Sequence, residues 1–291
     1  MASLTDYGPA MEIQWCPGCG NFGILTAMRR ALVALGLEPH QVLMVSGIGQ
    51  AGKFPHYLHS HVFNGLHGRT LPVATAAKIA NHELTVIAVG GDGDGYGEGG
   101  NHFINAMTRN VNFTYMVHNN QVYALTKGQA SPTSDPGFVT KTTPEGAWAP
   151  LRPLALAVAC DCSFVARSFS ADIDHLANII QLGIQHKGFA FIEVLQPCVS
   201  FNHVNTYEWY QKRVYKLEKD YDPTNRVAAF SKALEWGERI PLGVVYRNDR
   251  PVYEEQLGAL RTSPLVKQGL DPQQFEELLE ELTVQPLKPH R

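Results

Sequence analysis

The stretch that decides the fold runs from residue 84 to residue 100 and reads LTVIAVGGDGDGYGEGG. Its first part, Leu84 to Val89, is apolar on both faces, which is typical of a buried strand in a parallel sheet. Glycines interleaved with acidic residues follow at once, from Gly90 to Gly100. Glycines behind a buried strand let the backbone turn sharply and approach a bound group closely, and the following helix presents unpaired N–H groups to an anion. The stretch therefore predicts a phosphate site at the end of a strand.

Apolar runs of strand length recur along the chain, and helical patterns lie between them. We expect strands at Val42–Val45, Leu84–Val89, Phe113–Val117, Phe164–Ala166 and Phe189–Leu195. We expect helices at Phe22–Leu35, Val73–Asn81, Asn101–Arg109 and Ile173–Gln185. Strands that alternate with helices predict an α/β fold with a doubly wound, mostly parallel sheet, which binds its ligands at the C-terminal ends of the strands.

Composition and charge exclude several classes of protein. The chain has 291 residues and a net charge of −3, so no broad basic surface is present and nucleic acid is not an expected partner. No run of 18 apolar residues occurs, so no membrane span is expected either. The first residues carry no apolar signal region, and five cysteines are too few for a secreted disulfide framework. Together these features predict a cytoplasmic protein.

The composition changes near residue 206. Residues 1–205 contain all the patterns described above, and we expect them to form one ligand-binding domain. From Tyr207 onward tyrosines alternate with lysines and arginines, so residues 206–291 are expected to form a C-terminal extension that packs on this domain or on a partner subunit. A solvated surface is the alternative for this region. The last residues, 286–291, are expected to form a loose tail.

A second polar segment points to a cation. Asn120 comes just after the strand expected at Phe113–Val117, as Asp92 comes just after the strand that ends at Val89. Adjacent strands would bring both side-chain oxygens to one crevice, where they suit Mg²⁺, which takes its remaining oxygens from phosphate and water. An acidic residue beside a phosphate also calls for a cation between them. Two ordinary turns rich in Gly and Asn are the alternative.

The cysteines point to a second centre. Cys16 and Cys19 form C-x-x-C in a turn with Pro17 and Gly18, a spacing that lets two thiolates reach one metal centre. A redox dithiol is the alternative, although such pairs are found in a different βαβ context.

These motifs together resemble the β subunit of 2-oxoacid:ferredoxin oxidoreductases, most closely the 2-oxoglutarate type. Gly91-Asp92-Gly93 with Asn119-Asn120 is similar to the diphosphate motif of thiamine diphosphate enzymes. The same family is indicated by further strings: WCPGCG at 15–20, LHGR at 66–69, GNH at 100–102, LTKGQ at 125–129 and SPT at 131–133. The resemblance covers roughly residues 10 to 205 and is weak beyond them.

The resemblance implies the residues of a thiamine diphosphate site. Mg²⁺ would be held by Asp92, Asn120 and the backbone carbonyl of Val122. Ile48 would lie under the centre of the cofactor and force it into its V shape, and His67 would be a further contact, with a core histidine as the alternative. The other cofactor-binding residues implied are Ser46, Gly47 and Gly49 at the thiazolium and Gly91, Gly93 and Asp94 at the diphosphate.

The resemblance also implies a [4Fe-4S] cluster on Cys16, Cys19 and Cys198. Many members have a further cysteine after Gly-Ile-Gly, where this chain has Gln50. The fourth ligand is therefore open between an oxygen, a nitrogen and solvent. Cys160 and Cys162 are other candidates, but the apolar run before them indicates core thiols. Zinc on three cysteines is the competing metal.

The implied activity is the reversible, CoA-dependent oxidative decarboxylation of a 2-oxoacid, with electrons passed through the cluster to ferredoxin. In the reverse direction it would carboxylate an acyl-CoA, as in the reductive TCA cycle. The family places the carboxylate that acts on the aminopyrimidine in a separate pyrimidine-binding domain, so an α subunit is expected, in an αβ or α2β2 assembly.

Substrate choice rests on two positions. Lys53 and Leu125 resemble residues of the family's substrate pocket, and a cation at Lys53 would favour 2-oxoglutarate over pyruvate by pairing with its second carboxylate. An exposed loop lysine is the alternative. Two other functions stay open: a non-redox thiamine diphosphate decarboxylase or carboligase with a structural metal, and an electron-transfer subunit with no chemistry of its own.

Overall fold

The computed structural model describes residues 2–9, 11–261, 263–269 and 271–283. They form an 8-stranded sheet with the strand order β2-β1-β3-β4-β8-β7-β10-β9. Its strands are β1 Val42–Ser46, β2 His61–Asn64, β3 Thr85–Gly91, β4 Thr114–Asn119, β7 Phe164–Phe169, β8 Ala190–Leu195, β9 Val214–Lys216 and β10 Ile240–Arg247. Within the described chain, the one antiparallel pairing of this sheet joins β10 to β7. The predicted α/β class with a mostly parallel sheet is confirmed.

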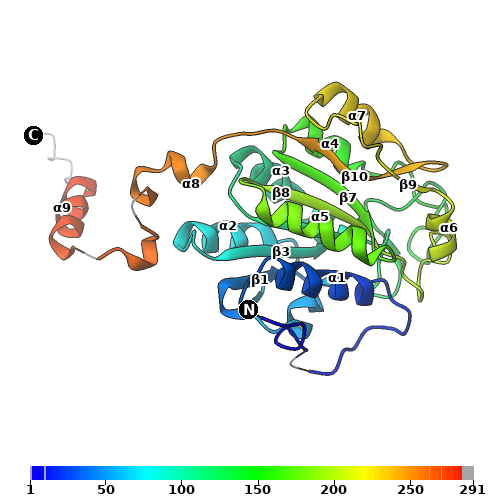
Figure 1. Ribbon diagram of the computed structural model, residues 1–291, viewed down its shortest axis with the longest axis horizontal. Coiled ribbons are helices and arrows are strands. Elements are labelled where there is room, and N and C mark those ends of the chain that lie inside the picture. The colour runs from blue at the N-terminus through cyan, green and yellow to red at the C-terminus, as the bar shows by residue number, and fades with distance from the viewer. Residues whose placement is uncertain (1, 10, 262, 270, 284–291) are drawn as a thin grey trace, which may run out of the picture.

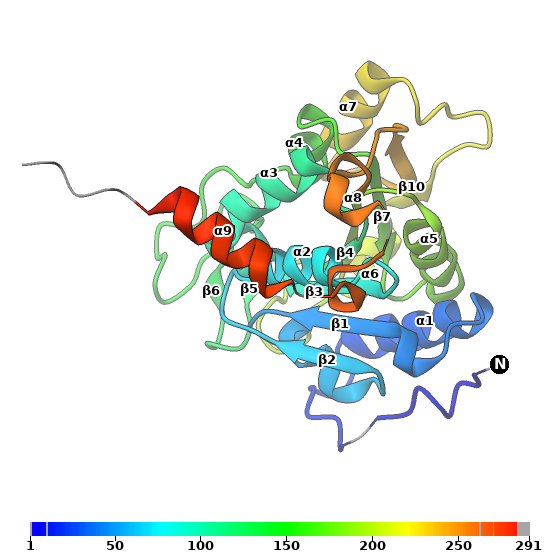
Figure 2. The same ribbon diagram turned by 90° about the vertical axis from the view of Figure 1, so that its left-hand side faces the viewer.

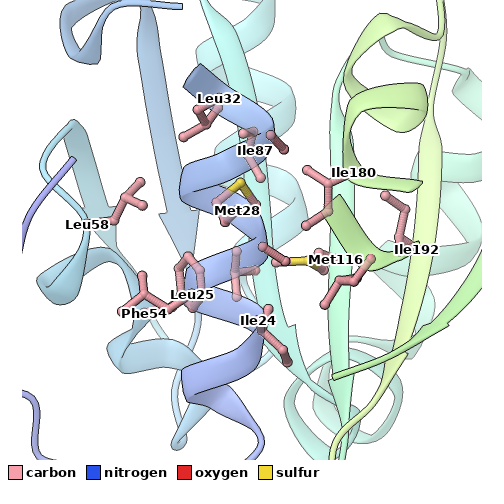
Figure 3. Packing of buried hydrophobic residues seen from close by; sticks show 14 of the residues in the cluster. Ile24, Leu25, Met28, Leu32, Phe54, Leu58, Ile87, Met116, Ile180 and Ile192 are labelled. Atoms are coloured by element: carbon pink, nitrogen blue, oxygen red, sulfur yellow. The ribbon is translucent and has the colours of Figure 1, made fainter. Parts of the chain in front are cut away.

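Helices cover both faces of the sheet, as the view in Figure 2 shows. One face carries α1 Asn21–Ala34 and α5 Ile173–Gln185, and the other carries α2 Thr70–Ala80, α3 Gly100–Arg109, α4 Pro153–Ala159 and α7 Arg226–Leu234. Figure 3 shows how Met28 and Leu32 of α1 meet Ile87 and Met116 of the sheet, with Ile180 of α5 beside them. The sheet is therefore buried on both sides, which explains why its central strands are apolar on both faces.

The chain after residue 206 continues the sheet. Helix α6 (Tyr207–Gln211) leads into β9, and α7 packs on α4 before β10 pairs with β7. The expected extension therefore begins as part of the main body. Sequence analysis did not predict β10, because Pro241 and Gly243 interrupt its apolar run, nor β9, which has three residues and none of them buried.

The end of the chain leaves this body as an arm, shown in orange and red in Figure 1. It contains α8 Tyr253–Gln256, two short 3-10 turns at Gly258–Leu260 and Leu265–Lys267, and α9 Pro272–Leu282. No residue of α9 is buried. The tail expected at 286–291 lies outside the described residues. Among the helices that are described, none is long and apolar enough to cross a membrane.

Candidate active site

The C-terminal ends of three adjacent strands, β1, β3 and β4, converge on one pocket. The predicted cofactor residues that line this cofactor pocket are Ile48, Gly49, His67, Gly91, Asp92, Gly93, Asp94, Asn120 and Val122. Leu125 also lines it. Ser46, Gly47 and Lys53 do not belong to the lining. The strand ends thus bring together residues that lie far apart in the sequence, as expected for a parallel sheet.

Asp94 ties three segments of the pocket together. Its Oδ1 accepts hydrogen bonds from the backbone N–H groups of Ile48 (2.9 Å) and Gly68 (2.8 Å), and its Oδ2 accepts one from Thr70 Oγ1 (3.2 Å). Burial raises the pKa of Asp94, while the two N–H donors oppose that shift. A Cβ on Gly47 would come within 2.2 Å of the Asp94 carboxylate, so this position requires glycine. Asp94 therefore fixes the loop that presents Ile48 to the pocket.

Ser46 and Gly47 hold the same loop through hydrogen bonds outside the pocket lining. Ser46 is fully buried, and its hydroxyl donates to the Gly52 carbonyl at 2.9 Å. The side-chain amide of Asn64, on β2, donates to Ser46 Oγ (2.8 Å) and to the Gly47 carbonyl (2.9 Å). These hydrogen bonds, together with their absence from the pocket lining, indicate that Ser46 and Gly47 position Ile48 and Gly49.

Asp92 is the buried carboxylate of the pocket and is 1% exposed. Its Oδ2 accepts hydrogen bonds from Ser131 Oγ (2.5 Å) and Thr133 Oγ1 (2.6 Å). Burial is the main cause that raises the pKa of Asp92 to about 6, against the lowering effect of the two hydroxyls. A bound cation would stabilise the ionised form that burial disfavours.

Asn120 completes the oxygen set. Its Oδ1 accepts a hydrogen bond from the Val122 N–H at 3.1 Å, and an amide oxygen has a second lone pair free for a cation. Val122 begins β5 (Val122–Tyr123), which pairs with β6 (Gln129–Ala130) and holds this turn in place. Because Asp92, Asn120 and Val122 line one pocket with hard oxygens, these residues fit Mg²⁺.

A buried ion pair supports this set from behind. Arg167 Nε donates to Glu193 Oε2 at 2.7 Å, and the two side chains are 2% and 0% exposed. Glu193 Oε1 accepts a hydrogen bond from Asn119 Nδ2 (2.9 Å), and Asn119 Oδ1 lies 2.8 Å from Thr133 Oγ1. The chain of contacts therefore runs from Arg167 through Glu193, Asn119 and Thr133 to Asp92. Sequence analysis missed the pair, although a glutamate inside the apolar strand FIEVL was a signal for it.

His67 lies at the rim of the pocket. Its Nδ1 is 3.1 Å from Glu98 Oε2 and 3.8 Å from Asp94 Oδ1, and its side chain is 37% exposed. The ring stacks on Tyr123 with 6.4 Å between the centroids. The alternative of a core histidine is therefore wrong, because His67 faces the pocket.

The two predicted substrate residues differ in their position. Leu125 is 43% exposed and lines the cofactor pocket. Lys53 lies in the 3-10 segment η2 (Ala51–Tyr57) and is half-buried, while the pocket lining includes its neighbour Ala51. The structure thus places Leu125 in the lining of the pocket, whereas Lys53 lies two residues along the chain from a lining residue.

A second, smaller pocket adjoins the first. Its lining includes Cys16, Cys19 and Cys198, and we call it the cysteine pocket. The C-x-x-C turn is closed by the Cys19 N–H on the Cys16 carbonyl (3.0 Å), and Gln196 Nε2 donates to Cys19 Sγ at 3.3 Å. Burial raises the pKa of Cys19 to about 11 and that of Cys198 in the same direction. The two pockets share Gln50, Asn120 and Ala124 in their walls.

The other two cysteines lie elsewhere. Cys162 is fully buried and Cys160 packs on the same hydrophobic cluster, between the sheet and α4. Neither lines the cysteine pocket, in agreement with the expectation of core thiols.

The arrangement of the three cysteines bears on the kind of metal centre. In the described part of the chain, no three His, Cys, Asp or Glu side chains are placed to hold a single metal ion. A four-iron cluster binds each thiolate to a different iron atom, so its sulfur ligands surround a volume and do not converge on one point. The three cysteines in the lining of one pocket thus supply thiolates of the kind that a cluster uses, and zinc takes the same kind of ligand.

Comparison with known proteins agrees with this geometry. A family model described as the C-terminal TPP binding domain of thiamine pyrophosphate enzymes matches residues 42–194, which contain β1 to β7, all but the last residue of β8, and the cofactor pocket. Fold and site thus define a thiamine diphosphate-binding enzyme domain. A second model, the C-terminal part of the pyruvate ferredoxin oxidoreductase beta subunit, matches residues 198–262. The resemblance therefore continues well past residue 205, where sequence analysis expected it to weaken.

Individual relatives show to which family of thiamine diphosphate-binding enzymes the chain belongs. The 2-oxoacid:ferredoxin oxidoreductase subunit beta of Saccharolobus solfataricus is 47% identical over 84% of this chain and 85% of its own length. The 2-oxoglutarate oxidoreductase subunit KorB of Mycobacterium tuberculosis is 43% identical over 68% of this chain and 53% of its own. A solved structure of 2-oxoglutarate:ferredoxin oxidoreductase from Magnetococcus marinus matches with a TM-score of 0.89 and 34% identity, covering 95% of this chain and 96% of that one. The chain belongs to the β subunits of the 2-oxoacid:ferredoxin oxidoreductases.

Proposed function

We propose that this chain, together with an α subunit, catalyses the reversible CoA-dependent oxidative decarboxylation of 2-oxoglutarate to succinyl-CoA and passes the electrons through a [4Fe-4S] cluster to ferredoxin. The observation that carries the proposal is the common wall of the cofactor pocket and the cysteine pocket, which share Gln50, Asn120 and Ala124. Electrons released in the first pocket would therefore reach the second through residues that line both pockets.

The cofactor pocket supplies positioning and charge. Thiamine diphosphate, when bound, would supply a carbon nucleophile for the keto carbon of the substrate and a thiazolium ring that takes up the electron pair left by the departing carbon dioxide. Asp92, Asn120 and the Val122 carbonyl would hold Mg²⁺, which neutralises the diphosphate. Asp94 accepts a hydrogen bond from the backbone N–H of Ile48 and so fixes this residue, whose side chain would lie under the centre of the cofactor. These residues account for binding and orientation of the cofactor.

The metal content of the complex tests the electron route. We expect the β chain, co-purified anaerobically with its α subunit, to contain thiamine diphosphate, iron and sulfide, and to reduce ferredoxin or a viologen dye when a 2-oxoacid and CoA are added. Zinc in place of iron, with no dye reduction, would favour the non-redox decarboxylase or carboligase. Iron and sulfide without thiamine diphosphate would favour a pure electron-transfer subunit.

An α subunit is required because this domain supplies one side of the cofactor site. The described residues that line the cofactor pocket include Asp92 and Asp94, and both carboxylates are already engaged by groups of the chain itself. The resemblance to the family implies that the carboxylate for the aminopyrimidine comes from the pyrimidine-binding domain of the α subunit, in an αβ or α2β2 complex. The arm that ends in α9, together with the surface of residues 206–247, is proposed to pack on a partner subunit, since α9 has no buried residue. The isolated β chain should bind thiamine diphosphate poorly.

The choice of 2-oxoglutarate is supported by relatives whose names specify this substrate and by Lys53. A cation beside the pocket would pair with the second carboxylate of 2-oxoglutarate, which pyruvate lacks. We expect Lys53→Ala to raise KM for 2-oxoglutarate at least tenfold more than KM for pyruvate, an effect of about 1.4 kcal/mol. Lys141→Ala, which removes an exposed lysine outside the pocket lining, is the matched control. Equal changes for both substrates would point to pyruvate or another 2-oxoacid as the natural substrate.

A further inference from the structure

Gln50 lies in the wall between the two pockets. Its backbone carbonyl accepts a hydrogen bond from Trp15 Nε1 at 2.9 Å, which fixes it next to the C-x-x-C turn that begins at Cys16. Its side-chain oxygen Oε1 is buried and has no hydrogen-bond partner among the described residues. A buried amide oxygen that the chain leaves unpaired needs a partner from outside the chain. The pocket that it lines already holds three cysteines.

The three cysteines leave one position of a four-iron cluster without a thiolate. Such a cluster takes four protein ligands, and the remaining cysteines, Cys160 and Cys162, lie in a different hydrophobic cluster. We propose that the amide oxygen of Gln50 is the fourth ligand and binds the iron atom that has no cysteine. The inference rests on the proposed function, because it takes the cluster in the cysteine pocket as given.

This ligand set changes the properties of the cluster. A neutral amide oxygen replaces a negatively charged thiolate, so the cluster carries one negative charge less and is easier to reduce. The iron bound to oxygen also has the weakest protein bond and should be the first to leave. On oxidation by ferricyanide, one electron passes from [4Fe-4S]²⁺ to the oxidant, one ferrous ion is released, and a [3Fe-4S]⁺ cluster remains on the three cysteines.

The experiment compares the anaerobically purified αβ complex with three variants. Gln50→Cys offers a thiolate at the same position, and Gln50→Ala removes the oxygen and opens the corner to water. Gln196→Ala is the matched control, since Gln196 lines the same pocket but its amide nitrogen already donates to Cys19 Sγ and to the Pro197 carbonyl. Iron and sulfide are measured first, followed by the electron paramagnetic resonance spectrum of the dithionite-reduced cluster in ordinary water and in water enriched in oxygen-17.

We expect no oxygen-17 broadening in the wild type, in Gln50→Cys or in Gln196→Ala, and clear broadening in Gln50→Ala, where water binds the iron. One equivalent of ferricyanide should release one iron per cluster from the wild type and from Gln196→Ala, whereas Gln50→Cys should retain all its iron. The reduction potential of Gln50→Cys should lie below that of the wild type.

Three results would overturn the inference. Broadening in the wild type as large as in Gln50→Ala would show that solvent is the fourth ligand. Loss of iron from Gln50→Cys to the same extent as from the wild type would show that position 50 does not reach the cluster, and this comparison stands even where Gln50→Ala does not fold. Absence of iron and sulfide from the wild-type complex would refute the cluster itself and with it the proposed electron route. The iron and sulfide content therefore distinguishes a failure of the proposed function from a failure of Gln50 as a ligand.

Discussion

Replacing Arg167 by methionine would remove the positive partner of the buried carboxylate of Glu193. The two groups are 2.7 Å apart, and both side chains are almost fully shielded from water. The guanidinium also lies 5.4 Å from the ring centroid of Trp236. Methionine fills much of the volume of the arginine stem, so the substitution mainly removes charge and hydrogen bonds and leaves only a small cavity.

The size of the effect follows from the burial of the pair. Breaking a buried ion pair by removal of one partner costs about 3–5 kcal/mol, because the remaining charge is left uncompensated. In a domain of this size that loss corresponds to a decrease in Tm of roughly 10 °C. Neutralising both partners in Arg167→Met/Glu193→Gln removes the unpaired charge and keeps a side-chain oxygen at position 193 that accepts from Asn119. The double variant should therefore lose only about 1–2 kcal/mol.

The assay is thermal and urea unfolding of the αβ complex carrying each variant, followed by circular dichroism. A double-mutant cycle then separates the energy of the pair from the cost of the individual substitutions. Since Asn119 and Thr133 connect Glu193 to Asp92, the single variant should also need more Mg²⁺ to bind thiamine diphosphate. If the single variant were as stable as the wild type, or the double variant no more stable than the single one, the ion pair would not support the site.

Three further predictions concern the carboxylates of the cofactor pocket. A proton competes with the cation for Asp92, whose pKa is about 6, so the apparent Mg²⁺ affinity should fall about tenfold per pH unit below pH 6 and level off above it, as measured by calorimetry; a flat profile from pH 5 to 7 would contradict Asp92 as a ligand. Without the metal, a rise in pH has the opposite effect. Because the pKa of Asp92 is higher in the folded chain than in the unfolded chain, the folded chain loses stability as the pH rises from 3.8 towards 6. Gly47→Ala would place a methyl group 2.2 Å from the Asp94 carboxylate and should weaken thiamine diphosphate binding at least tenfold, whereas Gly100→Ala, whose Cβ would meet nothing within 4 Å, should bind normally.

Sequence analysis could predict the centre of the sheet because burial on both faces leaves a clear pattern. The run Leu84 to Val89 became β3, and the helix predicted at Ile173–Gln185 has those bounds in the structure as α5. The edge strand β2 left no such pattern, since all four of its residues are exposed. Patterns of hydrophobicity report how deeply a segment is buried, and they are silent on strands that are held mainly by backbone pairing.

In the candidate site, too, some residues could be predicted from the sequence and others could not. Asp92 and Asn120 were predictable because each follows a strand whose end is visible in the sequence, and parallel strands end at one edge. Ser131 and Thr133, which donate to Asp92, were quoted as part of a motif but not as its partners. Their contact depends on how the chain returns after the β5–β6 hairpin, and the sequence pattern does not contain that path. Side chains brought together by long-range packing therefore need the structure.

Asn202 links the two pockets through hydrogen bonds, in addition to the wall residues that the pockets share. The side-chain amide of Asn202 donates to the backbone carbonyl of Asn120 at 3.1 Å, while its own N–H donates to the carbonyl of Cys198 at 3.1 Å. Asn202 is 2% exposed, so both bonds are shielded from water. A shift of the loop that carries Cys198 would therefore move the turn that carries Asn120, and the reverse. Direct hydrogen bonds through one asparagine thus help to set the relative position of the cysteine pocket and the proposed Mg²⁺ site.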